Sequence, residues 1–343
     1  MKKTIFLFPL IAIIVLFSSL SFQEEPTTIT ENSSVWEVLM SFGEPAPNHL
    51  PDESIQGASA ERGEQIIKGG VTSKPRGGKI NTQSNHFVCT SCHNIEKETP
   101  NLLITDPEAR LKYAGEKGIP FLQGTTLFGA VNRSSFYNDD YEKKYGALVL
   151  PTRNNLREAI QLCAVECSQG RRLKDWQLES VLRYLWTLEL KISDLNLSEN
   201  DLEQLNTWST KATDVKNEEA INFIQSKYQK GSPAHFVTPP KDRKTGYGLT
   251  GNPENGQLIY ELSCLHCHEK ETYSSYNLTK TKATFKYLKK HFKRYSRYSV
   301  YQVARYGTSP LPGKRAYMPQ YTKEKMSDQQ LEDLRAYIER EAR

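Results

Sequence analysis

The sequence contains little cysteine, little methionine and few long apolar runs. Only six cysteines and four methionines occur among its 343 residues, and hydrophobic residues make up 37%. Beyond the N-terminus, no segment is apolar enough to span a bilayer, and the mean hydropathy of −0.62 is typical of a soluble chain. The cysteines form three close pairs, which indicates local chemistry rather than a framework of long-range disulfides. The pairs are Cys89 with Cys92, Cys163 with Cys167, and Cys264 with Cys267.

The one long apolar run lies at the N-terminus and predicts export. Lys2 and Lys3 precede an apolar segment at residues 5–17, and small and polar residues follow it. This order is typical of a secretory signal, and we assign residues 1–22 to a signal peptide. An uncleaved membrane anchor is the alternative interpretation. Both interpretations place the remainder of the chain outside the inner membrane, so the expected location is the periplasm.

Two of the cysteine pairs belong to a Cys-x-x-Cys-His motif, which is typical of c-type haem attachment. The thiols bond to the two vinyl groups of the porphyrin, and the adjacent histidine supplies the proximal iron ligand. A thioredoxin-like redox pair would not require the histidine, and a zinc site built from both pairs would leave both histidines unexplained. The motifs therefore predict two covalently bound haem c groups. The attachment residues are Cys89, Cys92, Cys264 and Cys267, and the iron ligands are His93 and His268.

Similar helical patterns precede the two motifs. Asn252 is a suitable cap and Pro253 suits the first turn of a helix that leads to the second motif. The segment at residues 58–70 matches it loosely, with Gly63 aligned to Gly256 and the pair Ile66–Ile67 aligned to Leu258–Ile259. An insertion of roughly twenty residues then separates this helix from the first motif.

Similar helical patterns also follow the motifs. Residues 176–190 and 329–343 both predict amphipathic helices, and Ser327 begins a capping box for the second of them. A helix before the haem motif and a terminal helix after it resemble the cytochrome c fold. We therefore predict an all-α protein with two tandem cytochrome c domains joined by a helical, Pro-rich linker that drapes over one domain. The expected divisions are residues 1–22 (signal peptide or anchor), 23–57 (N-terminal extension), 58–191 (domain 1), 192–250 (linker) and 251–343 (domain 2).

The second domain offers a methionine as the distal iron ligand. Met318 is followed by proline and lies shortly before the predicted terminal helix. This arrangement resembles the distal loop of class I cytochromes c, and the resemblance implies His/Met ligation, which raises the haem potential. Met326 is the alternative, but it lies at the helix cap, where it is expected to pack.

The first domain has no methionine at the matching place. The thirteen residues that separate Met318 from Leu331 lead, when counted back from Leu178, to Val165. Val165 lies between the two cysteines of the remaining pair. The sequence here resembles the thiosulfate dehydrogenases and the related di-haem subunit of the sulfur-oxidation complex. The residues that fit the family's pattern are Ile160, Cys163, Gly170 and Leu173.

In that family the cysteine is the distal ligand of the catalytic haem, so the resemblance implies that Cys163 has this role. The chain departs from the family pattern at Glu166 and Cys167, where an Arg-Ser pair is usual. A Cys163–Cys167 disulfide, Cys167 as the ligand, and His86 as the ligand remain alternatives. A thiolate ligand at domain 1 would lower its haem potential, so electrons would run from domain 1 to domain 2.

The charge of the second domain is uneven. No acidic residue occurs between Tyr273 and Thr322. A basic surface around a haem steers docking to a redox partner with an acidic face, although some of these charges are expected to neutralise the haem propionates. Interleaved tyrosines at positions 295, 298, 301 and 306 are expected to pack on the haem or the helix core, and we do not expect nucleic acid binding. The basic residues are Lys280, Lys282, Lys286, Lys289, Lys290, Lys293, Arg294, Arg297, Arg305, Lys314 and Arg315.

Three functions are compatible with these features. The first is electron transfer by a di-haem carrier with no substrate chemistry. The second is a thiosulfate dehydrogenase-like oxidoreductase that acts on a small sulfur oxyanion, with Cys163 in its active site. The third is a haem-based binder of small ligands, which an open coordination position at the first haem would permit. Whether the chain is an enzyme stays open at this point.

Overall fold

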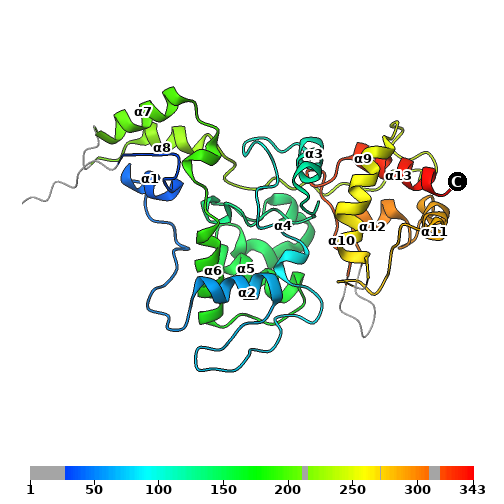
Figure 1. The fold of residues 1–343 in the computed structure, drawn as a ribbon, viewed down its shortest axis with the longest axis horizontal. Coiled ribbons are helices and arrows are strands. Elements are labelled where there is room, and N and C mark those ends of the chain that lie inside the picture. Colours follow the sequence, from blue (N-terminus) through cyan, green and yellow to red (C-terminus); the bar gives the residue numbers. More distant parts are fainter. Residues whose placement is uncertain (1–27, 211–214, 271, 309–316) are drawn as a thin grey trace, which may run out of the picture.

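The computed structural model describes residues 28–210, 215–270, 272–308 and 317–343 (Figure 1). In these residues the secondary structure is helical, with isolated β-bridges and no strands. The prediction of an all-α protein is therefore confirmed. None of the helices in the described ranges is long and apolar enough to cross a membrane. The expected signal at residues 1–22 lies outside the described residues.

The helices expected before and after the two motifs are present, and the structure adds others that were not predicted. Short π-helical turns, η4 (Cys163–Cys167) and η6 (Tyr260–Cys264), extend two of the α-helices. The α-helices are α1 (Val35–Ser41), α2 (Ala60–Gly69), α3 (Pro107–Lys117), α4 (Asp139–Tyr145), α5 (Leu156–Leu162), α6 (Asp175–Thr187), α7 (Glu199–Thr210), α8 (Glu218–Gln225), α9 (Pro253–Ile259), α10 (Leu265–His268), α11 (Lys282–Phe292), α12 (Val300–Tyr306) and α13 (Asp328–Glu341).

A glycine-mediated helix crossing occurs twice in the chain. Helix α2 packs on α6, and α9 packs on α13. A Cβ atom at Gly63 would lie 1.9 Å from the Ser180 carbonyl oxygen, and a Cβ atom at Gly256 would lie 2.0 Å from that of Asp333. Each glycine therefore allows two helix backbones to approach more closely than any other residue would permit. The two crossings are equivalent, because each joins a helix that precedes a motif to a helix that follows it.

The glycines also set the register between the two helix pairs. Ile66 and Ile259 each lie three residues after the glycine, and they are 1% and 0% exposed. The expected alignment of Ile66 with Leu258 is therefore wrong by one residue. Leu258 is only partly buried and instead contacts α3, where its Cδ1 lies 3.3 Å from the position of a Cβ atom at Gly115.

Substitution of Gly63 with alanine is expected to destabilise the first helix pair by about 1–3 kcal/mol, because the added methyl group meets backbone that has to move. Gly69, at the end of the same helix, serves as the matched control, since a Cβ atom there would have no other atom within 4 Å. Gly69→Ala is expected to leave stability unchanged or to raise it slightly. Thermal unfolding followed by circular dichroism measures both changes. Equal midpoints for the two variants would contradict the close crossing.

The N-terminal extension and the start of the linker pack together. Helices α1, α7 and α8 share a small apolar core (Figure 1). The amide of Val35 donates to the Leu190 carbonyl over 3.0 Å, and the amide of Ile192 donates to the Ser33 carbonyl over 3.0 Å. The two segments that flank domain 1 in sequence are therefore joined in space. The buried members are Ile29, Val35, Val38, Leu39, Phe42, Leu190, Ile192, Leu195, Leu205, Ala220, Ile221, Ile224 and Tyr228.

The Pro-rich end of the linker contacts both halves of the protein, rather than one domain as expected. The Asn138 side-chain amide donates to the Ala234 carbonyl over 2.8 Å on the domain 1 side. The Tyr247 ring packs edge-on against Tyr301 of α12, with centroids 5.7 Å apart. This segment therefore spans the boundary between the halves.

Helix α3 also joins the halves, because it packs into the core of residues 251–343 although it belongs to the first half of the sequence. Leu111 and Ala114 of α3 and the following Phe121 are buried in the same cluster as Ile259. The Phe121 amide donates to the Leu262 carbonyl over 2.9 Å. Figure 1 shows α3 beside α9, away from α2 and α6. The two halves consequently share apolar core and do not meet only at a polar surface.

Candidate functional site

The first motif presents its histidine in a form that can bind iron. Cys89 starts a short 3₁₀ turn, η1 (Cys89–Ser91), and His93 follows it. The Nδ1 atom of His93 lies 2.6 Å from the Thr125 carbonyl oxygen and therefore carries the proton. A Cβ atom at Gly124 would lie 2.6 Å from His93 Nδ1, so only glycine lets this loop pack against the ring. The Nε2 atom remains available for a metal.

The second motif has the same arrangement. The turn η6 and helix α10 carry its cysteines, and His268 Nδ1 lies 2.7 Å from the Tyr276 carbonyl oxygen. Burial lowers the pKa of both His93 and His268, which favours the neutral imidazole that binds metals. Burial also raises the pKa of the Cys89 and Cys267 thiols to about 11, as expected in apolar surroundings. Both donor sets therefore fit a covalently attached haem.

The two motifs lie against each other. The Cys267 Sγ atom is 3.9 Å from the Ser91 carbonyl oxygen, although the two residues are 176 positions apart. His266, between the cysteines of the second motif, also interacts with the backbone of Thr90, between those of the first. Nothing in the spacing of the motifs predicts this contact. It places the two sets of attachment residues side by side.

The third cysteine pair lies beside the first motif. Cys163 and Cys167 begin and end the π-helical turn η4, whereas an α-helical turn was expected. Both are free thiols and hydrogen-bond to each other. The hydrogen bond that Cys163 donates to Cys167, together with burial, raises the pKa of Cys163, and the neighbouring Cys89 and Cys92 add to this shift. The structure thus brings Cys163 to the first motif, as a distal ligand requires.

A group of aromatic residues surrounds this cysteine pair and was not anticipated. The Tyr141 ring lies 4.9 Å from Tyr137 and 5.0 Å from Phe236 of the linker, centroid to centroid. Tyr137 hydrogen-bonds to Cys167, and Lys144 Nζ lies 4.4 Å above the Phe236 ring. Tyrosines at positions 137, 141 and 145 recur every four residues, which was the available sequence signal. These residues provide an apolar enclosure with one positive charge.

The two methionines of the second half have different surroundings. The Met318 amide donates to Thr308 Oγ1 over 2.8 Å, and its carbonyl accepts from the Thr308 amide over 2.9 Å, which fixes the main chain of this loop. The adjacent Tyr317 ring packs on Phe87, just before the first motif, at 5.6 Å. Met326 is 2% exposed within the apolar core, in agreement with the expected packing role. Met318 as an iron ligand stays a prediction.

The described basic residues of the acid-free stretch at residues 273–322 are exposed, except for Arg305. Arg305 is 1% exposed and forms an ion pair with Asp328 at 2.7 Å, so it does not belong to the exposed set. Lys314 and Arg315 lie outside the described residues. We call the exposed set around α11 the basic face. Its members are Lys280, Lys282, Lys286, Lys289, Lys290, Lys293, Arg294 and Arg297.

The tyrosines of this region differ in their burial. Tyr301 is fully buried, but Tyr295, Tyr298 and Tyr306 are 68%, 40% and 50% exposed. Tyr301 therefore packs in the helix core, as expected. Tyr295 and Tyr298 lie between α11 and α12, and Tyr306 ends α12. The packing of these three on a haem stays a prediction.

A chain of aromatic contacts leads from the second histidine to the basic face. The His268 ring lies 5.9 Å from Tyr276, and Tyr276 lies 6.4 Å from Tyr287 on α11. Tyr287 in turn lies 4.4 Å from His291 and 6.3 Å from Tyr298. Tyr276, Tyr287 and Tyr298 are all exposed, so the chain of rings ends at the protein surface.

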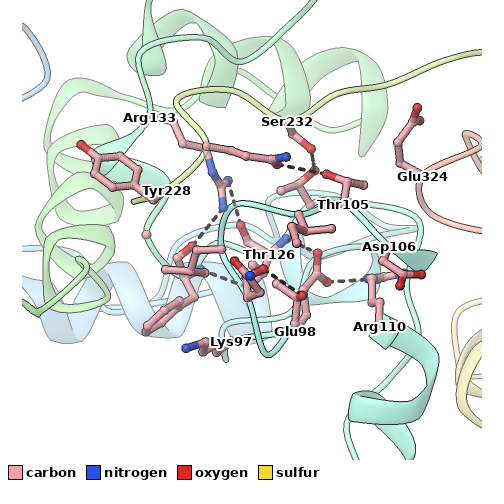
Figure 2. A pocket seen from close by; sticks show the side chains of 18 of the residues that line it. Lys97, Glu98, Thr105, Asp106, Arg110, Thr126, Arg133, Tyr228, Ser232 and Glu324 are labelled. Carbon is pink, nitrogen blue, oxygen red and sulfur yellow. Dashed lines mark hydrogen bonds and ion pairs between the residues drawn. The ribbon is translucent and has the colours of Figure 1, made fainter. Parts of the chain in front are cut away.

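A buried ion cluster joins the two halves near the first motif. Glu98 accepts from Arg110 Nη2 over 3.0 Å and from Lys325 Nζ over 2.8 Å, and all three side chains are at least nine-tenths buried (Figure 2). Burial alone would raise the pKa of Glu98, but the two cations outweigh it and hold the pKa well below its usual range. Sequence analysis did not identify this cluster.

Comparison with known proteins bears on the second half only. Residues 251–338 match the family described as Cytochrome C oxidase, cbb3-type, subunit III. These residues form a cytochrome c domain. The cytochrome c domain contains Cys264, Cys267, His268 and Met318, so the chain holds at least one covalently bound haem c and transfers electrons with redox partners. Such domains are typically extracytoplasmic.

No match extends to the first motif or to the thiosulfate dehydrogenases. No curated protein and no solved structure matches the chain. The cytochrome c domain is therefore the part of the chain whose family is known, and the role of residues 58–191 rests on their own geometry.

Proposed function

We propose that the chain is an exported di-haem c-type cytochrome, with one haem at each Cys-x-x-Cys-His motif. The contact between Cys267 and Ser91 supports this proposal, because the two motifs lie side by side. Electron transfer between cofactors requires such proximity. The domain 1 haem would receive electrons, and the cytochrome c domain would deliver them to a redox partner.

The geometry of the first half supports a haem there. Its α2–α6 crossing repeats the α9–α13 crossing of the cytochrome c domain, with glycine at the same point. His93 and His268 both donate from Nδ1 to a backbone carbonyl within 2.7 Å. A redox-active dithiol would not need a histidine held in this way.

The two haems would differ in their distal ligands. Cys163 lies at the first site and Met318 lies in the loop before α13 of the second site. A thiolate ligand stabilises ferric iron, whereas a thioether raises the potential. The difference directs electrons from the first haem to the second.

Oxidation of a sulfur oxyanion is the more specific candidate at the first site. Coupling of two thiosulfate ions forms one sulfur–sulfur bond and releases two electrons, which matches two ferric haems that each accept one. Bound haems would supply these acceptors, while the chain encloses the substrate with Tyr137, Tyr141 and Phe236. Lys144 supplies a positive charge over the Phe236 ring of this enclosure. The thiosulfate dehydrogenase family has arginine where this chain has Glu166. Arg171 and Arg172 do not replace that positive charge, because Arg171 donates to Gln177 and Arg172 faces Glu158.

Mixing of the oxidised holoprotein with thiosulfate in the absence of oxygen tests this candidate. We expect rapid growth of the reduced haem absorbance in the wild type and in Cys167→Ala, and its loss in Cys163→Ala. Ascorbate is expected to reduce all three proteins. Reduction by ascorbate without reduction by thiosulfate would leave a pure electron carrier. Binding of carbon monoxide by the wild type would instead favour the small-ligand binder, because a Cys163-ligated haem has no open position.

The basic face is expected to govern electron exit to a partner with an acidic surface. In Lys286→Glu/Lys290→Glu, oxidation of the reduced holoprotein by ferricyanide, an anion, is expected to slow about tenfold at low ionic strength. Oxidation by the cationic cobalt(III) tris-phenanthroline is expected to accelerate. Stopped-flow absorbance measures both rates. Lys74→Glu/Lys79→Glu changes the charge equally on an exposed loop of the first half and is the control. Equal slowing in the control would assign the effect to net charge alone.

A further inference from the structure

A cavity with several charged side chains in its lining lies where the two halves and the linker meet (Figure 2). Its volume of about 90 Å³ is enough for several water molecules. Segments from residues 97–106, 125–133, 228–232 and 324–325 line it. Thr125, whose carbonyl binds His93 Nδ1, is one of the lining residues. Because iron would bind Nε2, the cavity is not on the distal side, where substrate chemistry is proposed.

The cavity contains more basic groups than its carboxylates neutralise. Arg133 donates from Nη1 to the Thr126 carbonyl and from Nη2 to the Phe128 carbonyl, both over 3.0 Å. It has no carboxylate partner in the described part of the chain. Burial lowers the pKa of Arg133 to about 10. The Nε atom of the buried Arg110 has no hydrogen-bond partner among the described residues.

Each carboxylate of the cavity is already committed to another group. Glu98 is shared by Arg110 and Lys325. Asp106 accepts from backbone amides at the start of α3, and Glu324 pairs with His235 of the linker. Four cations, Lys97, Arg110, Arg133 and Lys325, therefore face three carboxylates, and Arg133 and the half-buried Lys97 are the two cations without a carboxylate partner among the described residues. Burial also lowers the pKa of Lys325 to about 8, in agreement with excess positive charge around it.

Neutral hydrogen-bond donors complete the lining. Thr125 Oγ1 and Ser232 Oγ lie 2.7 Å apart, and one of these hydroxyl groups is free to donate elsewhere. Guanidinium groups bind tetrahedral oxyanions through paired N–H donors, and hydroxyl groups add short hydrogen bonds. Buried cations beside hydroxyl groups in one cavity are typical of anion sites.

We propose that this cavity binds a small divalent oxyanion of the sulfate type, in addition to any substrate at the first haem. The ligand would offset the charge of Arg133 and Lys97 and bridge segments of both halves and the linker. Because a ligand that binds only the folded chain raises its stability, the site would make the assembly of the halves sensitive to anion concentration. This inference does not depend on thiosulfate oxidation, since sulfate cannot donate the electrons.

Titration calorimetry of the holoprotein with sodium sulfate, at ionic strength held constant with sodium chloride, tests the proposal. We expect saturable binding of one sulfate per chain and a thermal midpoint that rises with sulfate. Arg133→Gln and Lys97→Gln are each expected to weaken binding at least about tenfold, through loss of a charge-assisted contact. Lys79→Gln, on an exposed loop, is the matched control and should bind as the wild type does.

The outcomes separate this site from the proposed enzyme activity. Cys163→Ala should lose thiosulfate oxidation yet keep sulfate binding. The absence of saturable sulfate binding by the holoprotein would overturn the proposal. Occupation of the cavity by the carboxylates of the haem would give the same negative result and would overturn it too. Unchanged affinity in Lys97→Gln and Arg133→Gln would also overturn it. Lys97 is half-exposed, so its variant is expected to fold even if Arg133→Gln does not.

Discussion

Replacement of both Cys89 and Cys92 with alanine is expected to reduce the covalent haem from two groups per chain to one. Without thiols at the first motif, the porphyrin vinyl groups have nothing to bond to, whereas the motif of the cytochrome c domain is untouched. The pyridine haemochrome absorbance per chain measures the content directly. The same halving is expected for Cys264→Ala/Cys267→Ala.

The Cys163→Ala variant is the control for this experiment, because a distal ligand does not attach the porphyrin. It should keep both covalent haems and change only the spectrum of the first. An unaltered haem content in the Cys89→Ala/Cys92→Ala chain would show that residues 58–191 carry no haem c. The two helix crossings would then share their packing geometry but not a haem cofactor.

Substitution of Glu98 with glutamine is expected to destabilise the protein by about 3–5 kcal/mol, because it leaves Arg110 and Lys325 buried without a counter-charge. Chemical denaturation of the holoprotein measures the loss. Glu96→Gln, two residues earlier in the same loop and exposed, is the control and should have little effect. Similar losses in the two variants would contradict a special role for the buried cluster.

Glu98 is also expected to make the stability of the protein depend on pH. The pKa of Glu98 is lower in the folded chain than in the unfolded chain, so its contribution is complete above the ordinary glutamate pKa. The contribution is lost progressively as pH falls below that value, because the unfolded chain then takes up a proton first. We therefore expect the free energy of unfolding of the wild type to fall more steeply with acid than that of Glu98→Gln.

The features that sequence could predict are those set by neighbouring residues. Asn252 caps α9 by accepting from the amides of Glu254 and Asn255, and Ser327 forms the capping box of α13 as expected. The attachment motifs are also local, since the chemistry of the porphyrin fixes their spacing. Such short-range rules operate wherever the chain is placed.

The features that sequence did not predict depend on contacts between distant residues. Lys325 lies 227 positions from Glu98, and neither residue has a neighbour in sequence that indicates an ion pair. The packing of α3 into the core of the cytochrome c domain was not predicted for the same reason, because the sequence of an amphipathic helix does not specify the surface that it packs against. The tyrosines at 137, 141 and 145 are visible as a series, but only folding brings them to Cys167.

The packing of α1 against α7 and α8 has a consequence for the time course of folding. The hydrogen bonds of Val35 with Leu190 and of Ile192 with Ser33 tie together both ends of domain 1. Closure of so long a loop costs entropy that grows with the logarithm of its length, and contacts of high sequence separation form slowly. Domain 1 is therefore expected to fold first, and these hydrogen bonds between the segments that flank it are expected to form late. In unfolding, early loss of these hydrogen bonds would expose domain 1 while its α2–α6 crossing remains intact.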